Sequence, residues 1–340
     1  MSEGSEKRSA WSKVRLHVVT GKGGTGKSTV AAALALSLAS EGKSVLLCEV
    51  EGRQGIARMF DVDPLPYQER EIARGLRGEG ENGAGVVHAL HIDPESALME
   101  YLAMYYKLGR AGRALDRFGV IEFATTIAPG ARDVLLTGKV FEAVERNSRN
   151  KGATRYDAVV LDAPPTGRIS QFLNVSDELA GLAKMGPIKH QSDTMMTLFR
   201  SPRTAVHLVT VLEEMPVQET ADGIAELRSN RLPVGAVVVN MVRPRDLQAE
   251  DLAAARAGTL DAARVQGDLK QAGVDTDDDL VRGLLTEAHD HAERRALEDS
   301  QRTIVGGLGV PVLELARLAG GVDLGGLYEL AADIREQGLR

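Results

Sequence analysis

Cysteine is nearly absent from this sequence: its 340 residues include one, Cys48, within the apolar run SVLLCEV. A single thiol excludes an internal disulfide, a CxxC zinc site and a four-cysteine iron–sulfur site within the chain. The apolar neighbours of Cys48 predict a buried small side chain rather than a reactive thiol. We therefore expect neither zinc nor an iron–sulfur cluster as a cofactor.

Long apolar runs and an excess of basic residues are also missing. The longest apolar run, VAAALALSLA, is about half the length that a membrane-spanning helix needs. The N-terminal MSEGSEKRSAWS lacks the apolar stretch of a secretory signal, so we expect a disordered polar tail over residues 1–13. The net charge of −7 shows no broad basic footprint for nucleic acid. These features predict a cytoplasmic protein with at most peripheral membrane contact and no nucleic-acid partner.

Short β-branched runs recur along the chain, and longer helical stretches lie between them. Runs with little polar alternation are typical of strands buried on both faces of a parallel sheet, and intervening helices imply right-handed crossovers. The sequence therefore predicts an α/β fold with a doubly wound, mainly parallel sheet. We expect one domain over residues 14–340, with helical insertions at about 97–147, 174–203 and 246–303. The predicted strands lie in VRLHVVT, SVLLCEV, VVHALHID, YDAVVLDAP, AVHLVTVL, VGAVVVN and VPVLEL.

A glycine-rich stretch carries the strongest chemical signal. Residues 21–28, GKGGTGKS, fit the pattern G-x-x-x-x-G-K-[ST] and lie between a predicted strand and a predicted helix. Glycines let backbone N–H groups surround phosphate oxygens, and the helix N-terminus adds a favourable field. Lys27 is expected to reach the β- and γ-phosphates, and Ser28 to hold Mg²⁺. A turn that merely joins strand to helix is the alternative. The predicted nucleotide-binding residues here are Gly21, Lys22, Gly23, Gly24, Thr25, Gly26, Lys27, Ser28 and Thr29.

A second stretch, AVVLDAPPTGRISQFL, places Asp162 at the end of a buried strand. A carboxylate there commonly orients Mg²⁺ or its waters, so we expect Ser28 and Asp162 at the metal, the latter through water. A lone aspartate at a strand end is usually a turn former, so this interpretation depends on the glycine-rich loop. The following residues force the chain out of the strand and predict a loop that responds to the γ-phosphate: Pro164, Pro165, Thr166 and Gly167.

Lys22 narrows the class of protein. The form KGGxGKS resembles the deviant loop of a branch of dimeric ATPases, which includes partitioning and division-site ATPases, the nitrogenase iron protein, and the arsenite and tail-anchored-protein targeting ATPases. DAPPTGRISQFL resembles the second switch of the last group, D-T-A-P-T-G-H followed by an arginine and Phe-Leu. Further matches are ALHIDPESAL, IAPGARDVL, ET at 219–220, VVVN and VPVLEL, so nearly the entire chain is covered. The sequence is similar to the arsenite-transporting and tail-anchored-protein targeting ATPase family, most of all to its actinobacterial anion-transporting members.

The resemblance implies an ATP- and Mg²⁺-driven switch that works as a homodimer or as a heterodimer with a paralogue. Lys22 would contact the phosphates bound by the facing subunit and compensate charge on the transferred group, as an arginine finger does. A solvent-facing loop lysine is the alternative. Asn240 would hydrogen-bond the adenine, the loop after Pro311 would pack against the base, and Glu213 would lie near the nucleotide at the dimer interface. On chemistry alone, Asn240 is equally a turn residue at a strand end.

The main departure from the family lies in CEVEGRQGIARMF, residues 48–60. The family's first switch places an aspartate before Pro-Ala-His, to orient or activate the attacking water, and Glu51 aligns with it. The added methylene moves the carboxylate by more than about 1 Å, and displacements of that size slow chemistry. Glu49 faces the same way and is a candidate to assist. We therefore expect Lys22, Lys27 and Glu51 as catalytic residues, with slow or partner-dependent hydrolysis.

Features of the two named branches are missing. Arsenite-handling members bind As(III) through several thiolates, which Cys48 alone cannot supply. Eukaryotic targeting members carry a CxxC zinc site and a long Met-rich insertion, whereas the stretch over residues 174–203 is short. Its apolar side chains are either simple packing or a small surface for a hydrophobic client: Met185, Met195, Met196, Leu198 and Phe199.

Three functions stay open. The first is an ATP-driven dimeric switch coupled to an unidentified client, a hydrophobic membrane protein or a transport partner. The second is a nucleotide-bound regulatory subunit of a heterodimer that hydrolyses little, which Glu51 and Gly52 favour. The third is a partitioning-type ATPase, which would favour a basic DNA-facing helix or a membrane-binding helix. The C-terminal GGLYELAADIREQGLR is only weakly amphipathic and carries no basic cluster.

Overall fold

The computed structural model describes residues 11–52, 54–76, 83–106, 129–146, 152–174, 187–244 and 247–339. The predicted polar tail lies outside these ranges except for its last three residues, and Met185 also lies outside them. Of the predicted insertions at 97–147 and 174–203, the structure describes residues 97–106, 129–146, 174 and 187–203.

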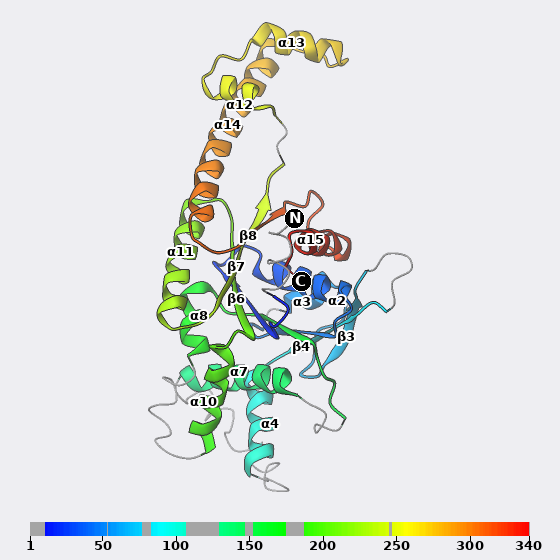
Figure 1. The fold of residues 1–340 in the computed structure, drawn as a ribbon. Helices are drawn as coiled ribbons and strands as arrows, with labels where there is room; N and C mark the ends of the chain where they lie inside the picture. The colour runs from blue at the N-terminus through cyan, green and yellow to red at the C-terminus, as the bar shows by residue number, and fades with distance from the viewer. Residues whose placement is uncertain are drawn as a thin grey trace.

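The core is one eight-stranded sheet in the order β3-β4-β2-β5-β1-β6-β7-β8 (Figure 1). Neighbouring strands are parallel throughout, except that β3 is antiparallel to β4 at one edge. The predicted fold, a doubly wound and mainly parallel sheet, is confirmed. The strands are β1 (Leu16–Gly21), β2 (Val45–Glu49), β3 (Arg70–Arg74), β4 (Val86–His91), β5 (Ala158–Asp162), β6 (Thr204–Thr210), β7 (Val234–Val242) and β8 (Val312–Ala316).

Alternate strand residues pack into two apolar layers, one on each face of the sheet. In β1, Leu16 and Val18 join one layer and Val19 joins the other. Because both faces are covered, the strands carry unbroken apolar runs, which is why they could be recognised in the sequence. The chain therefore holds β1 rigidly where it leads into the glycine-rich loop.

Helices cover both faces. One layer packs against α2 (Lys27–Ser40), α3 (Gly55–Met59) and α15 (Leu324–Glu336). The other packs against α7 (Pro129–Glu145), α8 (Thr166–Leu173) and α11 (Glu214–Ser229). From Val30 to Ser40 every residue of α2 is buried, and its small alanines let it lie close between the sheet and α15.

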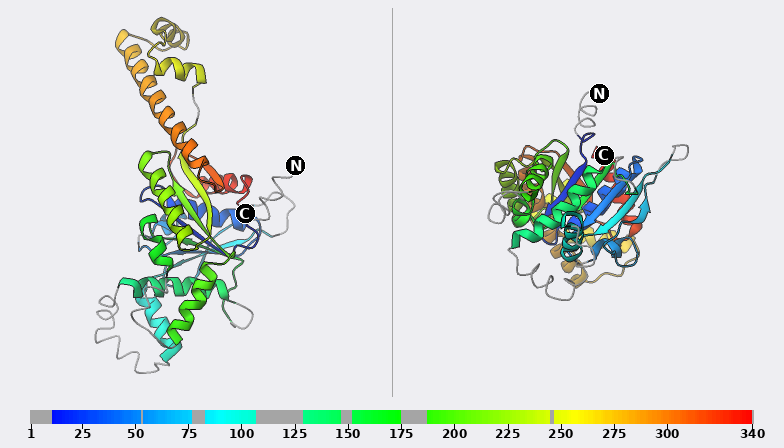
Figure 2. Two further views of the ribbon diagram at one scale, coloured as in Figure 1. Left: turned by 60° about the vertical axis from the view of Figure 1, so that its left-hand side comes forward. Right: turned by 90° about the horizontal axis from the view of Figure 1, so that it is seen from below.

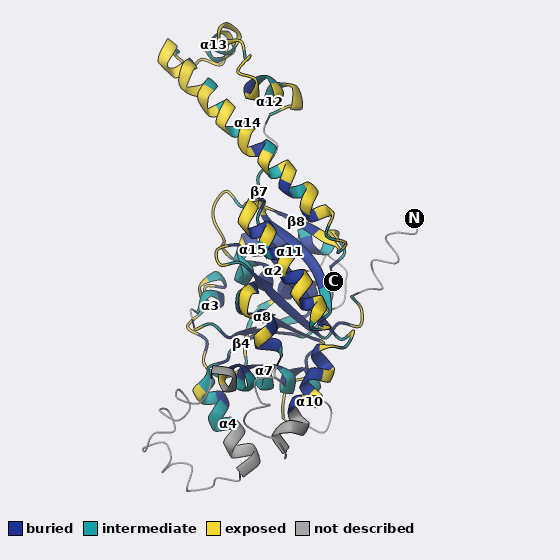
Figure 3. Cartoon of the chain, turned by 90° about the vertical axis from the view of Figure 1, so that its left-hand side faces the viewer, coloured by how far each residue is buried: buried dark blue, intermediate teal, exposed yellow. Residues whose placement is uncertain are grey.

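The remaining helices project beyond the sheet at its two ends (Figures 1 and 2). At one end lie α4 (Pro94–Tyr106) and α10 (Pro187–Phe199), beside α7. At the other end an arm is formed by α12 (Ala249–Arg256), α13 (Ala262–Gln271) and α14 (Asp278–Gly306). Figure 3 shows that α14 is exposed along most of its length. No helix in the described ranges combines the length and the apolar character needed to cross a membrane.

Two details differ from the simplest interpretation of the sequence. The edge strand β3 was not predicted, because its sequence REIAR is largely polar and none of its residues is fully buried. The apolar residues at the end of α10 belong to the core rather than to a client surface: the exposed fractions of Met195, Met196, Leu198 and Phe199 are 1%, 5%, 4% and 1%. The packing interpretation is confirmed for these four residues.

Candidate nucleotide-binding site

The glycine-rich loop joins the end of β1 to the start of α2, as predicted. Gly24 and Gly26 have φ angles of 90° and 86°, in the left-handed region, which costs an L-residue about 1–2 kcal/mol. Gly23 is exposed, and no atom lies within 4 Å of the position that a Cβ would take there. The backbone of the loop is therefore bare on one side, next to the N-terminus of α2, where N–H groups are free to bind an anion.

Asn240 fixes the other side of the loop. It lies near the end of β7, is 4% exposed, and donates from Nδ2 to the carbonyl oxygen of Thr25 over 2.9 Å. The Thr25 hydroxyl donates in turn to the carbonyl oxygen of Lys22 over 2.8 Å. A Cβ on Gly26 would overlap the Asn240 amide. In this structure Asn240 is thus a support of the loop, and the adenine contact stays a prediction.

Ser28 and Asp162 meet at the ends of α2 and β5. The Ser28 hydroxyl donates to Oδ2 of Asp162 over 2.5 Å, and Asp162 is 6% exposed. Burial raises the pKa of Asp162 to about 6; the bond from Ser28 and the charge of Lys27 oppose that rise, and Glu49 and Glu51 add to it. The two predicted metal-binding residues therefore lie together, with Lys27 close enough to act on the same carboxylate.

The donor set fits a magnesium–nucleotide complex. Mg²⁺ is usually bound by one or two carboxylates, substrate phosphates and retained waters. Oδ1 of Asp162 is buried and has no hydrogen-bond partner among the described residues, a costly state that a bound ligand would relieve. Within the described ranges no three His, Cys, Asp or Glu side chains form a metal cluster of their own. The cation would thus depend on the nucleotide phosphates as well as on Ser28 and Asp162.

The loop after Asp162 is held at both of its ends. Pro164 is buried, and its carbonyl oxygen accepts from the Thr20 hydroxyl over 2.7 Å. Pro165 precedes α8, which begins at Thr166. Thr166 is 4% exposed and packs so close to α11 that a Cβ on Gly223 would overlap it. The loop after Asp162 is thus packed against α11 through Thr166, while Gly167 is exposed.

Lys22 pairs with a residue of its own chain. Its Nζ lies 2.6 Å from Oε1 of Glu219 on α11, and the two side chains are 32% and 38% exposed. Such partly exposed pairs contribute about 0.2–1 kcal/mol. Lys22 is therefore held at the rim of the loop by a bond that costs little to exchange. Sequence reasoning noted Glu219 only as part of a matching dipeptide and missed this contact.

The first-switch segment follows β2. Glu51 is partly exposed and forms no hydrogen bond or ion pair among the described residues. Gln54 ties the segment down, because its side chain accepts from the backbone nitrogen of Leu65 over 2.7 Å and donates to the Leu65 carbonyl over 3.1 Å. The Thr29 hydroxyl lies 3.7 Å from Sδ of Met59, in the helix that follows.

Two other predicted residues lie farther out. Glu213 is exposed immediately before α11, the helix that carries Glu219. Pro311 precedes β8, and its carbonyl oxygen accepts from Val237, three residues before Asn240. Ala316, at the other end of β8, pairs with Val242, so residues 317–323 rather than Pro311 itself lie at the edge of the sheet where β7 ends. The base contact expected of the loop after Pro311 stays a prediction.

Residues 14–203 match the family described as anion-transporting ATPases. The chain belongs to the anion-transporting ATPase family. ATPase BagA of Mycobacterium tuberculosis is 55% identical over 329 residues, which cover 97% of this chain and 95% of that protein. The arsenical pump-driving ATPase of Escherichia coli is 31% identical over 230 residues, covering 66% and 34%. ATPase GET3 of Kluyveromyces lactis is 24% identical over 258 residues, covering 66% and 71%. The predicted family and the ATPase activity are confirmed.

Cys48 of this anion-transporting ATPase is fully buried in β2. Burial raises the pKa of its thiol, so the thiolate that a soft ligand such as As(III) needs is disfavoured.

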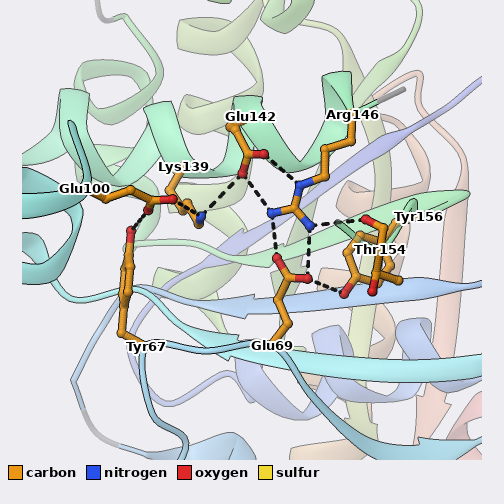
Figure 4. A network of polar contacts seen from close by, with 8 residues as sticks. All are labelled: Tyr67, Glu69, Glu100, Lys139, Glu142, Arg146, Thr154 and Tyr156. Atoms are coloured by element: carbon orange, nitrogen blue, oxygen red, sulfur yellow. Dashed lines mark hydrogen bonds and ion pairs between the residues drawn. The ribbon is translucent and has the colours of Figure 1, made fainter. Parts of the chain in front are cut away.

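The anion-transporting ATPase also carries a polar network between α7 and the segment after the first switch (Figure 4). At its centre Arg146, whose side chain is 4% exposed, binds Glu142 and Glu69 at distances of 2.6 to 2.9 Å. Burial by itself would raise the pKa of Glu69. Hydrogen bonds from Arg146 and Tyr156 outweigh burial, so the pKa of Glu69 lies below its ordinary value. The remaining members are Tyr67, Glu100, Lys139 and Thr154. The network fixes α7 to the chain that leads from Leu65 into β3.

Proposed function

We propose that the chain is a Mg²⁺-dependent ATPase that works as a dimeric switch, with Lys22 of each subunit serving the nucleotide of the other. The observation that carries this proposal is the position of Lys22. Its ammonium group is held at the rim of the loop by Glu219, whereas Lys27 and Ser28 already interact with the carboxylate of Asp162. A partly exposed cation with a weakly bound partner is suited to reach a neighbouring subunit.

The residues then divide the work as follows. The loop backbone and Lys27 bind the phosphates, and Ser28 and Asp162 would hold the cation. ATP supplies the phosphoryl group, and Mg²⁺ neutralises charge on it. Glu51 orients the attacking water. Lys22 of the partner subunit offsets the charge that develops in the transition state. Hydrolysis then reopens the dimer.

The coupled client is expected to act through α7. Gln54 and Leu65 connect the first switch to the network at Arg146. Arg168, in α8, lies 3.3 Å from Asp133 of α7. Both segments that we propose to respond to the nucleotide are thus linked to α7, which lies at the end of the molecule opposite the arm (Figure 1). We propose a membrane-protein or transport partner there, in cytoplasm, by analogy with relatives named as arsenical pump-driving ATPases.

A mixing experiment tests the shared site. The Lys22→Ala variant lacks the shared lysine, and the Glu51→Gln variant lacks the carboxylate that orients water. Each variant alone should therefore be inactive. In a mixed dimer, the nucleotide bound to the Lys22→Ala subunit meets Glu51 from its own chain and Lys22 from its partner. An equal mixture should recover about a quarter of the wild-type rate, because half of the dimers are mixed and each holds one complete site. No recovery means that Lys22 acts within its own subunit.

A regulatory subunit that hydrolyses little is the second candidate, favoured by the free and partly exposed position of Glu51. Hydrolysis measured over a range of protein concentrations, with the oligomeric state recorded in parallel, separates the two. A specific rate that rises with concentration supports the homodimeric switch. Tight ATP binding without phosphate release, relieved by a paralogous subunit, supports the regulatory role.

A further inference from the structure

Glu49 is a buried carboxylate that the proposed mechanism does not use. It ends β2 and is 2% exposed. Its Oε1 accepts from the backbone nitrogen of Gly55 over 2.8 Å. Its Oε2 has no hydrogen-bond partner among the described residues and lies 3.6 Å from Nδ1 of His91, which is beyond hydrogen-bonding distance. Oε2 of Glu49 is therefore available to bind a ligand.

Glu49 lies beside Asp162 in the sheet, and its charge acts on that carboxylate. Glu49 and Asp162 are direct partners in the parallel pair β2 and β5. Oδ1 of Asp162 is also buried without a hydrogen-bond partner in the described chain. Two neighbouring buried carboxylates, each with an unsatisfied oxygen, repel each other and lose solvation. A cation with its waters is the ligand that corrects both defects.

We propose that Glu49 is a positioning residue of the cation site, which binds water of the hydrated cation beside Asp162. This inference rests on the proposed Mg²⁺ dependence. Carboxylates that hydrogen-bond to the direct ligands of a metal typically lower its affinity by about 10–100-fold when they are removed. Glu51 differs from Glu49 because it lies beyond the strand and is partly exposed.

The competing explanation is that Glu49 only anchors the first switch through Gly55. Glu49→Gln separates the two roles, since glutamine keeps an oxygen for the Gly55 nitrogen and removes the charge. The measurement is equilibrium binding of a fluorescent ATP analogue, titrated with Mg²⁺ and repeated in EDTA. We expect Glu49→Gln to raise the half-saturating Mg²⁺ concentration about tenfold or more. Affinity in EDTA should be unchanged or higher, because a negative charge near the phosphates has been removed.

Glu226→Gln, which removes one charge from an exposed position near the C-terminal end of α11, is the matched control and should leave the Mg²⁺ midpoint within about twofold of wild type. An unchanged midpoint in Glu49→Gln overturns the proposal. If that variant fails to fold, Glu49→Asp decides. Aspartate keeps the charge, but its shorter side chain withdraws the carboxylate from the Gly55 nitrogen and weakens that hydrogen bond. A near-normal midpoint therefore supports the cation role, and a lost one supports the anchor. Wild-type binding that ignores Mg²⁺ instead refutes the proposed function itself.

Discussion

Alanine substitutions in the glycine-rich loop distinguish two roles of its glycines: allowing the backbone conformation of the loop, and leaving room for phosphate. At Gly26 an alanine meets both a φ of 86° and the Asn240 amide, and at Gly24 it meets only a φ of 90°. At Gly23 it meets neither. The free energy of unfolding should fall by about 1–2 kcal/mol in Gly24→Ala and by about 2–4 kcal/mol in Gly26→Ala. In Gly23→Ala it should change by no more than about 0.5 kcal/mol.

Affinity for ATP should follow a different order. The backbone at Gly23 is bare, so a methyl group there collides with nothing in the protein but would stand where phosphate must approach. Gly23→Ala should therefore weaken ATP binding at least about tenfold at nearly normal stability. Urea unfolding and anisotropy of a labelled ATP, measured on the same preparations, give both quantities.

Gly258→Ala is the matched control for strain away from the site, since its φ is 66° and no atom lies near its Cβ position. It should lose about 1–2 kcal/mol of stability and bind ATP normally. Wild-type ATP affinity in Gly23→Ala would refute the reasoning, because the phosphates could then not lie against that part of the loop. Normal stability of Gly26→Ala would show that the loop does not take the described path.

Three further predictions concern the surrounding structure. Arg146→Met should lower the free energy of unfolding by about 2–4 kcal/mol, because two partly buried carboxylates lose their partner. Arg203→Met breaks an ion pair whose side chains are 42% and 39% exposed, so it should cost less than about 1 kcal/mol. Urea unfolding compares the two variants. Burial lowers the pKa of His207 to about 3, so it takes up a proton only on unfolding, and stability should fall as pH drops below about 6.5, by up to about 1.4 kcal/mol per unit; the slope between pH 7 and 5.5 should be shallower in His207→Phe. Asn240→Ala should weaken ATP and inorganic triphosphate equally if it acts through Thr25; a loss confined to ATP would instead indicate the adenine contact.

The sequence predicted the inner parallel strands because they are covered on both faces and so carry apolar runs, as in β1, β2, β5 and β6. In β2 every residue is buried, including Glu49 at its end. The edge strand β3 has no such run, since one of its sides faces solvent and its polar residues are typical of a loop. The pattern therefore revealed the interior of the sheet and the edge strand β8, and it failed only at the polar edge strand β3.

The site was predictable where its residues are close in sequence and not where they are distant. Gly21 to Ser28 form one continuous motif, which the pattern identified directly. The contact of Asn240 with Thr25 joins residues 215 positions apart, and no local pattern records it. Glu49 and Glu51 look equivalent in the sequence, but burial distinguishes them: one ends a central strand and the other lies on the partly exposed segment beyond it.

The two connections to α7 differ in strength, and that difference bears on how a switch would work. Arg146 is almost fully buried and binds carboxylates on both sides, so the first-switch segment and α7 should move together. The polar link from α8 is weaker: it spans 3.3 Å and its Arg168 side chain is 58% exposed, so it contributes at most about 1 kcal/mol. The two helices also pack in one apolar layer, in which Val140 of α7 and Phe172 of α8 are fully buried. Because separating them would expose that layer to water, a rearrangement at Asp162 would shift α8 and α7 together rather than open a gap between them.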